Sequence, residues 1–149
     1  MAKSVLITIR SVMSDGQEAP YEISTTCSGT MSMTKAGVTL QYRDQLDDDS
    51  NPPTPRDVTV KILSDRVEMY QKGDYSIYAL VFMQGRRSDL KYHTAYGDME
   101  MAVFTTRLAM KTDPLDGHVS VQYSLESGGQ FMHAVELELH YAVVDGIRA

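Results

Sequence analysis

A single cysteine and a run of three aspartates are the first candidates for catalysis or metal binding in this sequence. Cys27 is the only thiol, and a catalytic cysteine needs a nearby base and surroundings that favour the thiolate. The apolar strand pattern around Cys27 instead predicts a buried, unreactive thiol. Asp47, Asp48 and Asp49 lack the spaced glycine and distal glutamate of a calcium-binding loop, so we interpret them as a solvated loop.

The four histidines do not form a metal-binding pattern. They are His93, His118, His133 and His140. None stands two residues from another histidine or from Cys27, so a zinc site would need distant segments to converge. His133 follows the apolar face of a predicted strand, where it could place a titratable group at a barrel mouth or simply end the strand half exposed. No nucleophile elbow, phosphate loop or dinucleotide fingerprint is present. We therefore predict no catalytic residue, no metal ligand and no cofactor.

Composition narrows the classes of partner. The net charge of −6 and the pI of about 5.1 argue against nucleic acid, for which a basic face supplies much of the affinity. Arg86, Arg87 and Lys91 form a compact basic patch that we interpret as a solvated loop. The longest apolar runs fall far short of the ~20 residues of a membrane helix. With one cysteine and no signal-peptide pattern, a cytoplasmic protein without membrane contact is expected.

The elements that must position these residues are strands, because hydrophobic residues recur with a period of two. The clearest alternation places Val119, Val121, Tyr123 and Leu125 on one face of a strand. About eight to ten such strands, joined by short turns, would leave exposed edges unless the sheet closes. We therefore predict a single all-β domain over residues 1–149, an antiparallel up-and-down β-barrel.

Three places interrupt this pattern. Residues 44–57 are acidic and proline-rich, which predicts a loop. Residues 77–83 are almost all apolar, so the period does not say which face points inward. Between Val103 and Leu108 the inward parity switches, which predicts a β-bulge. Without the bulge, Arg107 would point into the barrel and need a buried partner.

Two turn-and-strand stretches carry a resemblance to a known family. They are Gly29-Thr30-Met31 through Leu40-Gln41-Tyr42-Arg43-Asp44, and Tyr92-His93-Thr94-Ala95-Tyr96-Gly97-Asp98-Met99-Glu100-Met101. On these residues the chain resembles the YwiB-like family of small bacterial β-barrel proteins, and the order of elements fits along nearly the whole chain. The resemblance implies a barrel similar in shape to the lipocalin-like (calycin) barrels, and it implies no established activity.

Individual positions follow the same resemblance. A threonine, an aromatic residue and a glycine of the family pattern match Thr94, Tyr96 and Gly97, and a further threonine matches Thr105. The chain departs from the pattern at Asp44, where the family commonly has a glutamate, and in the longer acidic loop that follows.

The leading hypothesis is a non-catalytic module that binds a small hydrophobic or amphipathic ligand in the barrel. Ten methionines and no tryptophan give a soft, adaptable interior, and a barrel of this size can hold one small ligand. Its predicted binding residues are Met31, Met33, Leu40, Tyr42, Tyr92, Thr94, Tyr96, Met99, Met101, Thr105 and His133.

Two alternatives stay open. The first is a protein-interaction or homodimer module with a solid core. Its outer patch would comprise Tyr70, Tyr78, Leu80 and Phe82 if Ile77, Ala79 and Val81 point inward. The second is an enzyme, which would need tyrosine, threonine, histidine and acidic side chains to converge at one mouth of the barrel. We favour a protein that is not an enzyme.

Overall fold

The computed structural model describes residues 2–14, 20–45, 55–72, 77–94 and 97–144, and these residues form ten β-strands and no helix. The strands are β1 (Lys3–Ser14), β2 (Tyr21–Met33), β3 (Gly37–Gln45), β4 (Pro55–Leu63), β5 (Val67–Lys72), β6 (Ile77–Phe82), β7 (Arg87–Thr94), β8 (Gly97–Thr112), β9 (Asp116–Ser127) and β10 (Gln130–Val143). The all-β prediction is confirmed. In this part of the chain, no helix is long and apolar enough to cross a membrane.

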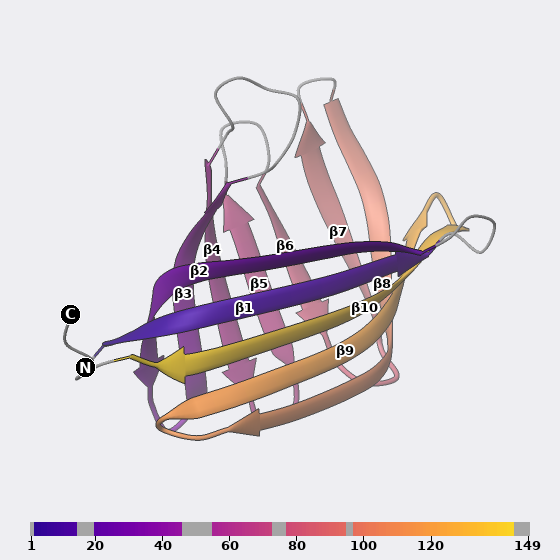
Figure 1. The fold of residues 1–149 in the computed structure, drawn as a ribbon. Coiled ribbons are helices and arrows are strands. Elements are labelled where there is room, and N and C mark those ends of the chain that lie inside the picture. Colours follow the sequence, from indigo (N-terminus) through magenta and orange to yellow (C-terminus); the bar gives the residue numbers. More distant parts are fainter. Residues whose placement is uncertain (1, 15–19, 46–54, 73–76, 95–96, 145–149) are drawn as a thin grey trace.

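The strands form one antiparallel sheet in the order β6-β5-β4-β3-β2-β1-β10-β9-β8-β7. Apart from β6 and β7, strands that follow each other in the chain are neighbours in the sheet. Pairing of β1 with β10 joins the two ends of the chain. Figure 1 shows β1, β2, β9 and β10 as the near wall and β3 to β7 as the far wall. The sheet thus curls into a nearly closed barrel, as predicted.

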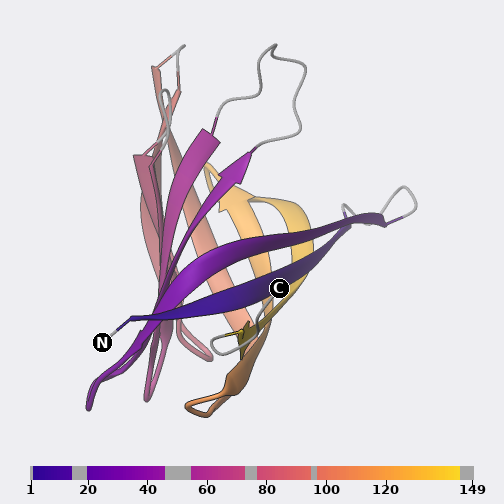
Figure 2. The same cartoon turned by 60° about the vertical axis from the view of Figure 1, so that its left-hand side comes forward.

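The interior holds the residues that the alternation placed there. Cross-strand partners share a face of the sheet, and the pairs Ile7–Tyr141 and Leu40–Val60 are buried. Burying an aliphatic or aromatic side chain of this size contributes about 1.5–3 kcal/mol, so these rows stabilise the barrel. Near the start of β2, Ile23 has the parity of the inward-facing residues of that strand, but it is 45% exposed. There β1 and β2 extend beyond the body of the barrel (Figure 2).

The predicted β-bulge in β8 is confirmed. The register of β8 against β9 shifts between Thr105 and Arg107. Val103 and Thr105 are fully buried before the shift, and Leu108 packs against the core after it. Arg107 is exposed. The extra residue therefore turns a charged side chain out to solvent while both halves of the strand keep an apolar inner row.

A buried tyrosine is fitted against a glycine in the near wall. Tyr141 on β10 pairs with Gly117 on β9, and a Cβ at position 117 would overlap the tyrosine ring. The Tyr141 hydroxyl donates a hydrogen bond to the carbonyl of Asp113 at 2.9 Å. Burial raises the pKa of the Tyr141 phenol above its ordinary value. Gly117 is therefore needed for close approach, and the turn after β8 is tied to β10.

Two sequence predictions need correction. Strands β3 and β4 extend into the predicted 44–57 loop, with Asp44 paired to Arg56 and Gln45 to Pro55; residues 46–54 lie outside the described part. Pro55 is tolerated because it is the first residue of its strand.

The second correction concerns β6. Register with β5 pairs Phe82 with Val67 and Leu80 with Met69. Val67 and Met69 are both buried. Phe82 is fully buried and Leu80 packs against the core. Leu80 and Phe82 therefore point inward, and they do not belong to the outer patch that we predicted for the case in which Ala79 and Val81 point inward. Tyr70 does remain outside, with 39% of its surface exposed.

Candidate functional site

Three of the four predicted binding residues on β2 and β3 are packed into the core. Met31 lies opposite Leu40, and Tyr42 lies opposite Gly29. Met31, Leu40 and Tyr42 have exposed fractions of 2%, 0% and 8%. Side chains that are buried to this extent, each against its cross-strand neighbour, fill the interior around them. This part of the predicted lining is therefore core. Cys27 is half-buried and packs against the same core.

The other predicted binding residues are scattered. Met33 is 40% exposed because it ends β2. Met101 and His133 are half-buried, on β8 and β10. Tyr92, Thr94 and Met99 are described by backbone register alone, and Tyr96 lies outside the described residues. The predicted set is thus not brought together into one lining by the residues that the structure describes.

Thr105 is the polar member of that set that reaches the interior. It is fully buried, and its hydroxyl has no hydrogen-bond partner in the part of the chain that the structure describes. The ring of its cross-strand neighbour Tyr123 packs against that of Phe82 at an angle of 44°, with ring centroids 4.8 Å apart. Leaving a buried hydroxyl unpaired costs about 1–3 kcal/mol. Thr105 is therefore a local weak point in an otherwise apolar wall.

The barrel has one seam, the border between β6 and β7. These strands follow each other in the chain, yet no strand pairing joins them in the described residues. Their connecting turn bonds to the β8 bulge instead. Gly85 N–H donates to Thr105 O at 2.8 Å, and Thr105 N–H donates to Arg86 O at 3.1 Å. The Gln84 side chain also accepts a hydrogen bond from Leu108 N–H at 3.1 Å. The bulge therefore anchors the turn, while the two strands leave their facing edges unpaired.

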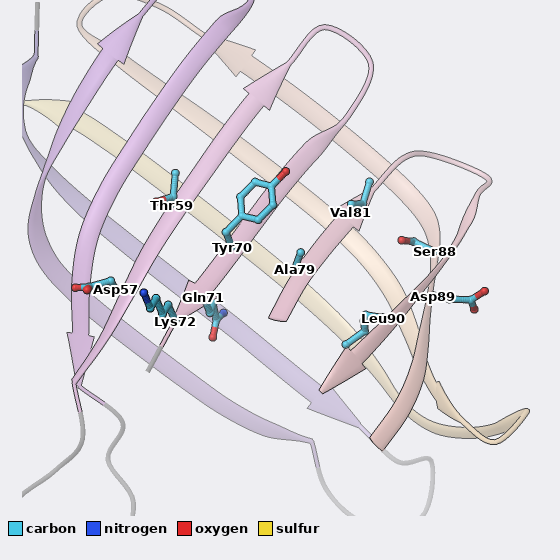
Figure 3. Close-up of a pocket in the computed structure, with 10 residues that line it drawn as sticks. All are labelled: Asp57, Thr59, Tyr70, Gln71, Lys72, Ala79, Val81, Ser88, Asp89 and Leu90. Atoms are coloured by element: carbon cyan, nitrogen blue, oxygen red, sulfur yellow. The ribbon is translucent and has the colours of Figure 1, made fainter. Parts of the chain in front are cut away.

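A groove with a volume of ≈ 700 Å³, which the described residues line, lies over this seam. We call it the seam groove. Most of its exposed surface is apolar, although six of its ten lining residues are polar or charged. The lining comprises Asp57, Thr59, Tyr70, Gln71, Lys72, Ala79, Val81, Ser88, Asp89 and Leu90 (Figure 3).

Register explains how these side chains come together. Thr59, Tyr70 and Ala79 form a cross-strand row on the outer face of β4, β5 and β6. Ser88 and Leu90 belong to the inner row of β7, because Ser88 pairs with the buried Val103 and Leu90 packs against the core. Figure 3 shows both reaching from β7 toward β6. The groove is thus the place where the outer surface meets side chains of an inner row.

Tyr70 is held in place on the groove wall. Its hydroxyl donates to Glu68 Oε1 at 2.6 Å, and Arg66 Nε donates to Glu68 Oε2 at 2.6 Å. The Lys61 ammonium lies 5.5 Å from the centroid of the Tyr70 ring, a cation–π distance. The hydrogen bond from Tyr70, followed by that from Arg66, lowers the pKa of the Glu68 carboxyl below its ordinary value. The same bond raises the pKa of Tyr70. A partly exposed aromatic ring is therefore presented in a fixed orientation.

The charges at the rim of the groove are mostly compensated. Arg43 Nε contacts Asp57 Oδ1 at 3.1 Å, and Arg87 lies 3.8 Å from Asp89. Arg87 also contacts Glu126 at 2.5 Å. Lys72 lies opposite Asp57 but makes no ion pair with any residue that the structure describes. Lys72 is thus the charged residue of the groove that has no ion-pair partner among the described residues.

The groove has the features of a binding site. Among the residues that the structure describes, no group of three or more histidine, cysteine, aspartate or glutamate side chains could hold a metal ion. The described residues that line the groove include no histidine or cysteine. An apolar floor with few charges at the rim suits the body of a guest molecule and one polar contact.

Sequence reasoning missed this site. The one available signal was the apolar run at residues 77–83, whose face could not be assigned. Alternation says which side chains point inward, but it does not say which two strands fail to pair.

Comparisons with known proteins support the fold. The family model described as "Domain of unknown function (DUF1934)" matches residues 7–139. The chain is similar to the crystal structure of the ywiB protein from Bacillus subtilis, with a TM-score of 0.82 and 19% sequence identity. That match covers 95% of this chain and 92% of the other. At this identity the likeness shows the fold alone, and the predicted YwiB-like resemblance is confirmed. None of the curated proteins compared with the chain matches it.

Proposed function

Because this chain belongs to the family of the domain of unknown function DUF1934, whose description names no activity, we propose a function from the geometry. The protein is a non-catalytic binding module that holds a hydrophobic or amphipathic guest in the seam groove. The site differs from the one predicted in the barrel interior, where Met31 and Leu40 are packed core.

One observation carries this proposal. The mostly apolar groove lies where two consecutive strands leave their edges unpaired. Its ≈ 700 Å³ falls within the range of about 300–1,000 Å³ that is typical of ligand sites. Tyr70 supports the proposal further, because rigidly held aromatic side chains often dominate binding energy. An apolar guest over Tyr70, Val81 and Leu90 would remove their exposed surfaces from water.

Titration with the dye anilinonaphthalene sulfonate, which fluoresces in apolar sites, tests the proposal. In Val81→Asp, a charge replaces an apolar groove wall, and we expect the dye to bind about tenfold more weakly. Leu6→Asp is the matched control, since Leu6 is 43% exposed on β1 and outside the groove. The control should keep the affinity of the unmodified protein. Circular dichroism establishes that both variants are folded.

Two results would overturn the proposal. The first is equal dye affinity in folded Val81→Asp and in the unmodified protein. The second is a dimer in sedimentation velocity that Val81→Asp abolishes, which would assign the groove to a second copy of the chain.

A further inference from the structure

The edge of β6 that faces the seam has the features of a strand acceptor. Residues 77–82 read Ile-Tyr-Ala-Leu-Val-Phe, with no charge, glycine or proline. Exposed edges of this kind pair readily with another extended chain, and proteins usually blunt them with charges or prolines. The neighbouring β7 has such charges in Arg87 and Asp89. In the described residues, β6 pairs with β5 on one side only.

We propose that the guest is an extended peptide segment of another protein, which adds a strand to the free edge of β6. This inference rests on the proposed function and names the class of guest. Backbone N–H and C=O groups of the peptide would pair with those of β6, and alternate side chains would enter the groove. Val81 and Ala79 are the apolar contacts on β6, and Tyr70 is the aromatic contact on the next strand.

The shape of the groove favours a single strand over a second copy of the chain. Ser88 and Leu90 of β7 form the wall opposite Val81. Two identical barrels could bring their β6 edges together only if β7 moved aside in both copies. A single extended segment brings no β7 of its own, so only the β7 of this chain would limit its access to β6.

Charge specifies one end of the peptide. Lys72 pairs with Ile77, so it lies at the beginning of β6. A peptide antiparallel to β6 would end near Lys72. Asp57 and Asp89 already have arginine partners, whereas Lys72 has none among the residues that the structure describes. The favoured peptide therefore carries apolar residues at alternate positions and an acidic residue at its carboxyl end.

Fluorescence anisotropy with a labelled probe tests the backbone pairing. The probe is a hexapeptide of alternating valine and threonine in which glutamate is the last residue. Two matched peptides carry N-methyl groups on the amide nitrogens of one edge or of the other edge. We expect the unmethylated probe to displace anilinonaphthalene sulfonate, and methylation of one edge to weaken binding at least tenfold more than methylation of the other.

The outcomes separate the two proposals. If both methylated peptides bind as well as the probe, or if the dye binds at Val81 and the peptide does not, strand addition is overturned and the binding module stands. If neither the dye nor the peptide binds, both proposals are overturned.

The acidic end is tested with Lys72→Met and with a probe that ends in glutamine. We expect Lys72→Met to weaken binding of the glutamate probe about fivefold to tenfold. The affinity for the glutamine probe should stay nearly unchanged. Equal losses for the two probes would overturn the assignment of Lys72.

Discussion

Strand β1 and strand β6 sit on opposite sides of the barrel and are stabilised differently. β1 pairs along its length with both β2 and β10, and its Val5 and Ile7 are fully buried. β6 is half as long, with 6 residues against 12, and pairs on one side. Its outer side chains, Ala79 and Val81, line a groove. The difference teaches that the long strands close the barrel, whereas the short strands β6 and β7 leave edges that are unpaired among the described residues. The proposed guest would bind there.

Truncation of the two walls should give the largest difference. Ile7→Ala removes a fully buried side chain between β2 and β10, so the free energy of unfolding should fall by about 3 kcal/mol. Val81→Ala removes less from a half-buried groove wall, and the fall should be below about 1 kcal/mol. Urea unfolding followed by circular dichroism measures both values. Equal losses would show that the seam is packed like the near wall.

Thr105→Val tests the weak point beside the turn that anchors the seam. Valine keeps the shape and removes a buried hydroxyl that has no partner among the described residues. We expect the free energy of unfolding to stay the same or to rise by up to about 1 kcal/mol. Thr105→Ser, which keeps the hydroxyl and loses the methyl group, should lower it. A clear loss in Thr105→Val would reveal that the hydroxyl is satisfied.

Acid should slightly lower the contribution that Glu68, beside the groove, makes to the free energy of unfolding. The folded-state pKa of Glu68 is lowered by Tyr70 and Arg66. Glu68 therefore contributes stability above its unfolded-state pKa, which is about 4.3, and this contribution is lost as the pH falls through the lower folded-state pKa. Glu68→Gln removes that contribution. Its unfolding free energy should thus differ from that of the unmodified protein by a few tenths of a kcal/mol at pH 7, and by less at pH 3. A constant difference between the two pH values would contradict the assigned cause.

Much of the fold is predictable from the chain because strand alternation is a local property. Val119 and Val121 are buried where their parity placed them. The change of parity between Val103 and Leu108 favoured a bulge, because a charged Arg107 would otherwise lie in the core, and the structure has the bulge. These inferences need only the sequence within one strand and the cost of burying a charge.

The site could not be predicted in the same way. Its position depends on which strands fail to pair, and closure of a barrel is set by the twist and stagger of all the strands together. Residues 77–82 are apolar on both faces, so parity could not show that Val81 points outward. Met33 has the inward parity, but its position at the end of β2 leaves it 40% exposed.

Amide hydrogen exchange at β6 and β1 tests the central claim most directly. In the free protein, amides of β6 that face the seam should exchange at least tenfold faster than those in the middle of β1, because no described strand pairs with them. Addition of the valine–threonine probe peptide should slow exchange at β6 and leave β1 unchanged. If the β6 amides are as protected as those of β1 without any guest, the seam is closed and the groove is not a binding site.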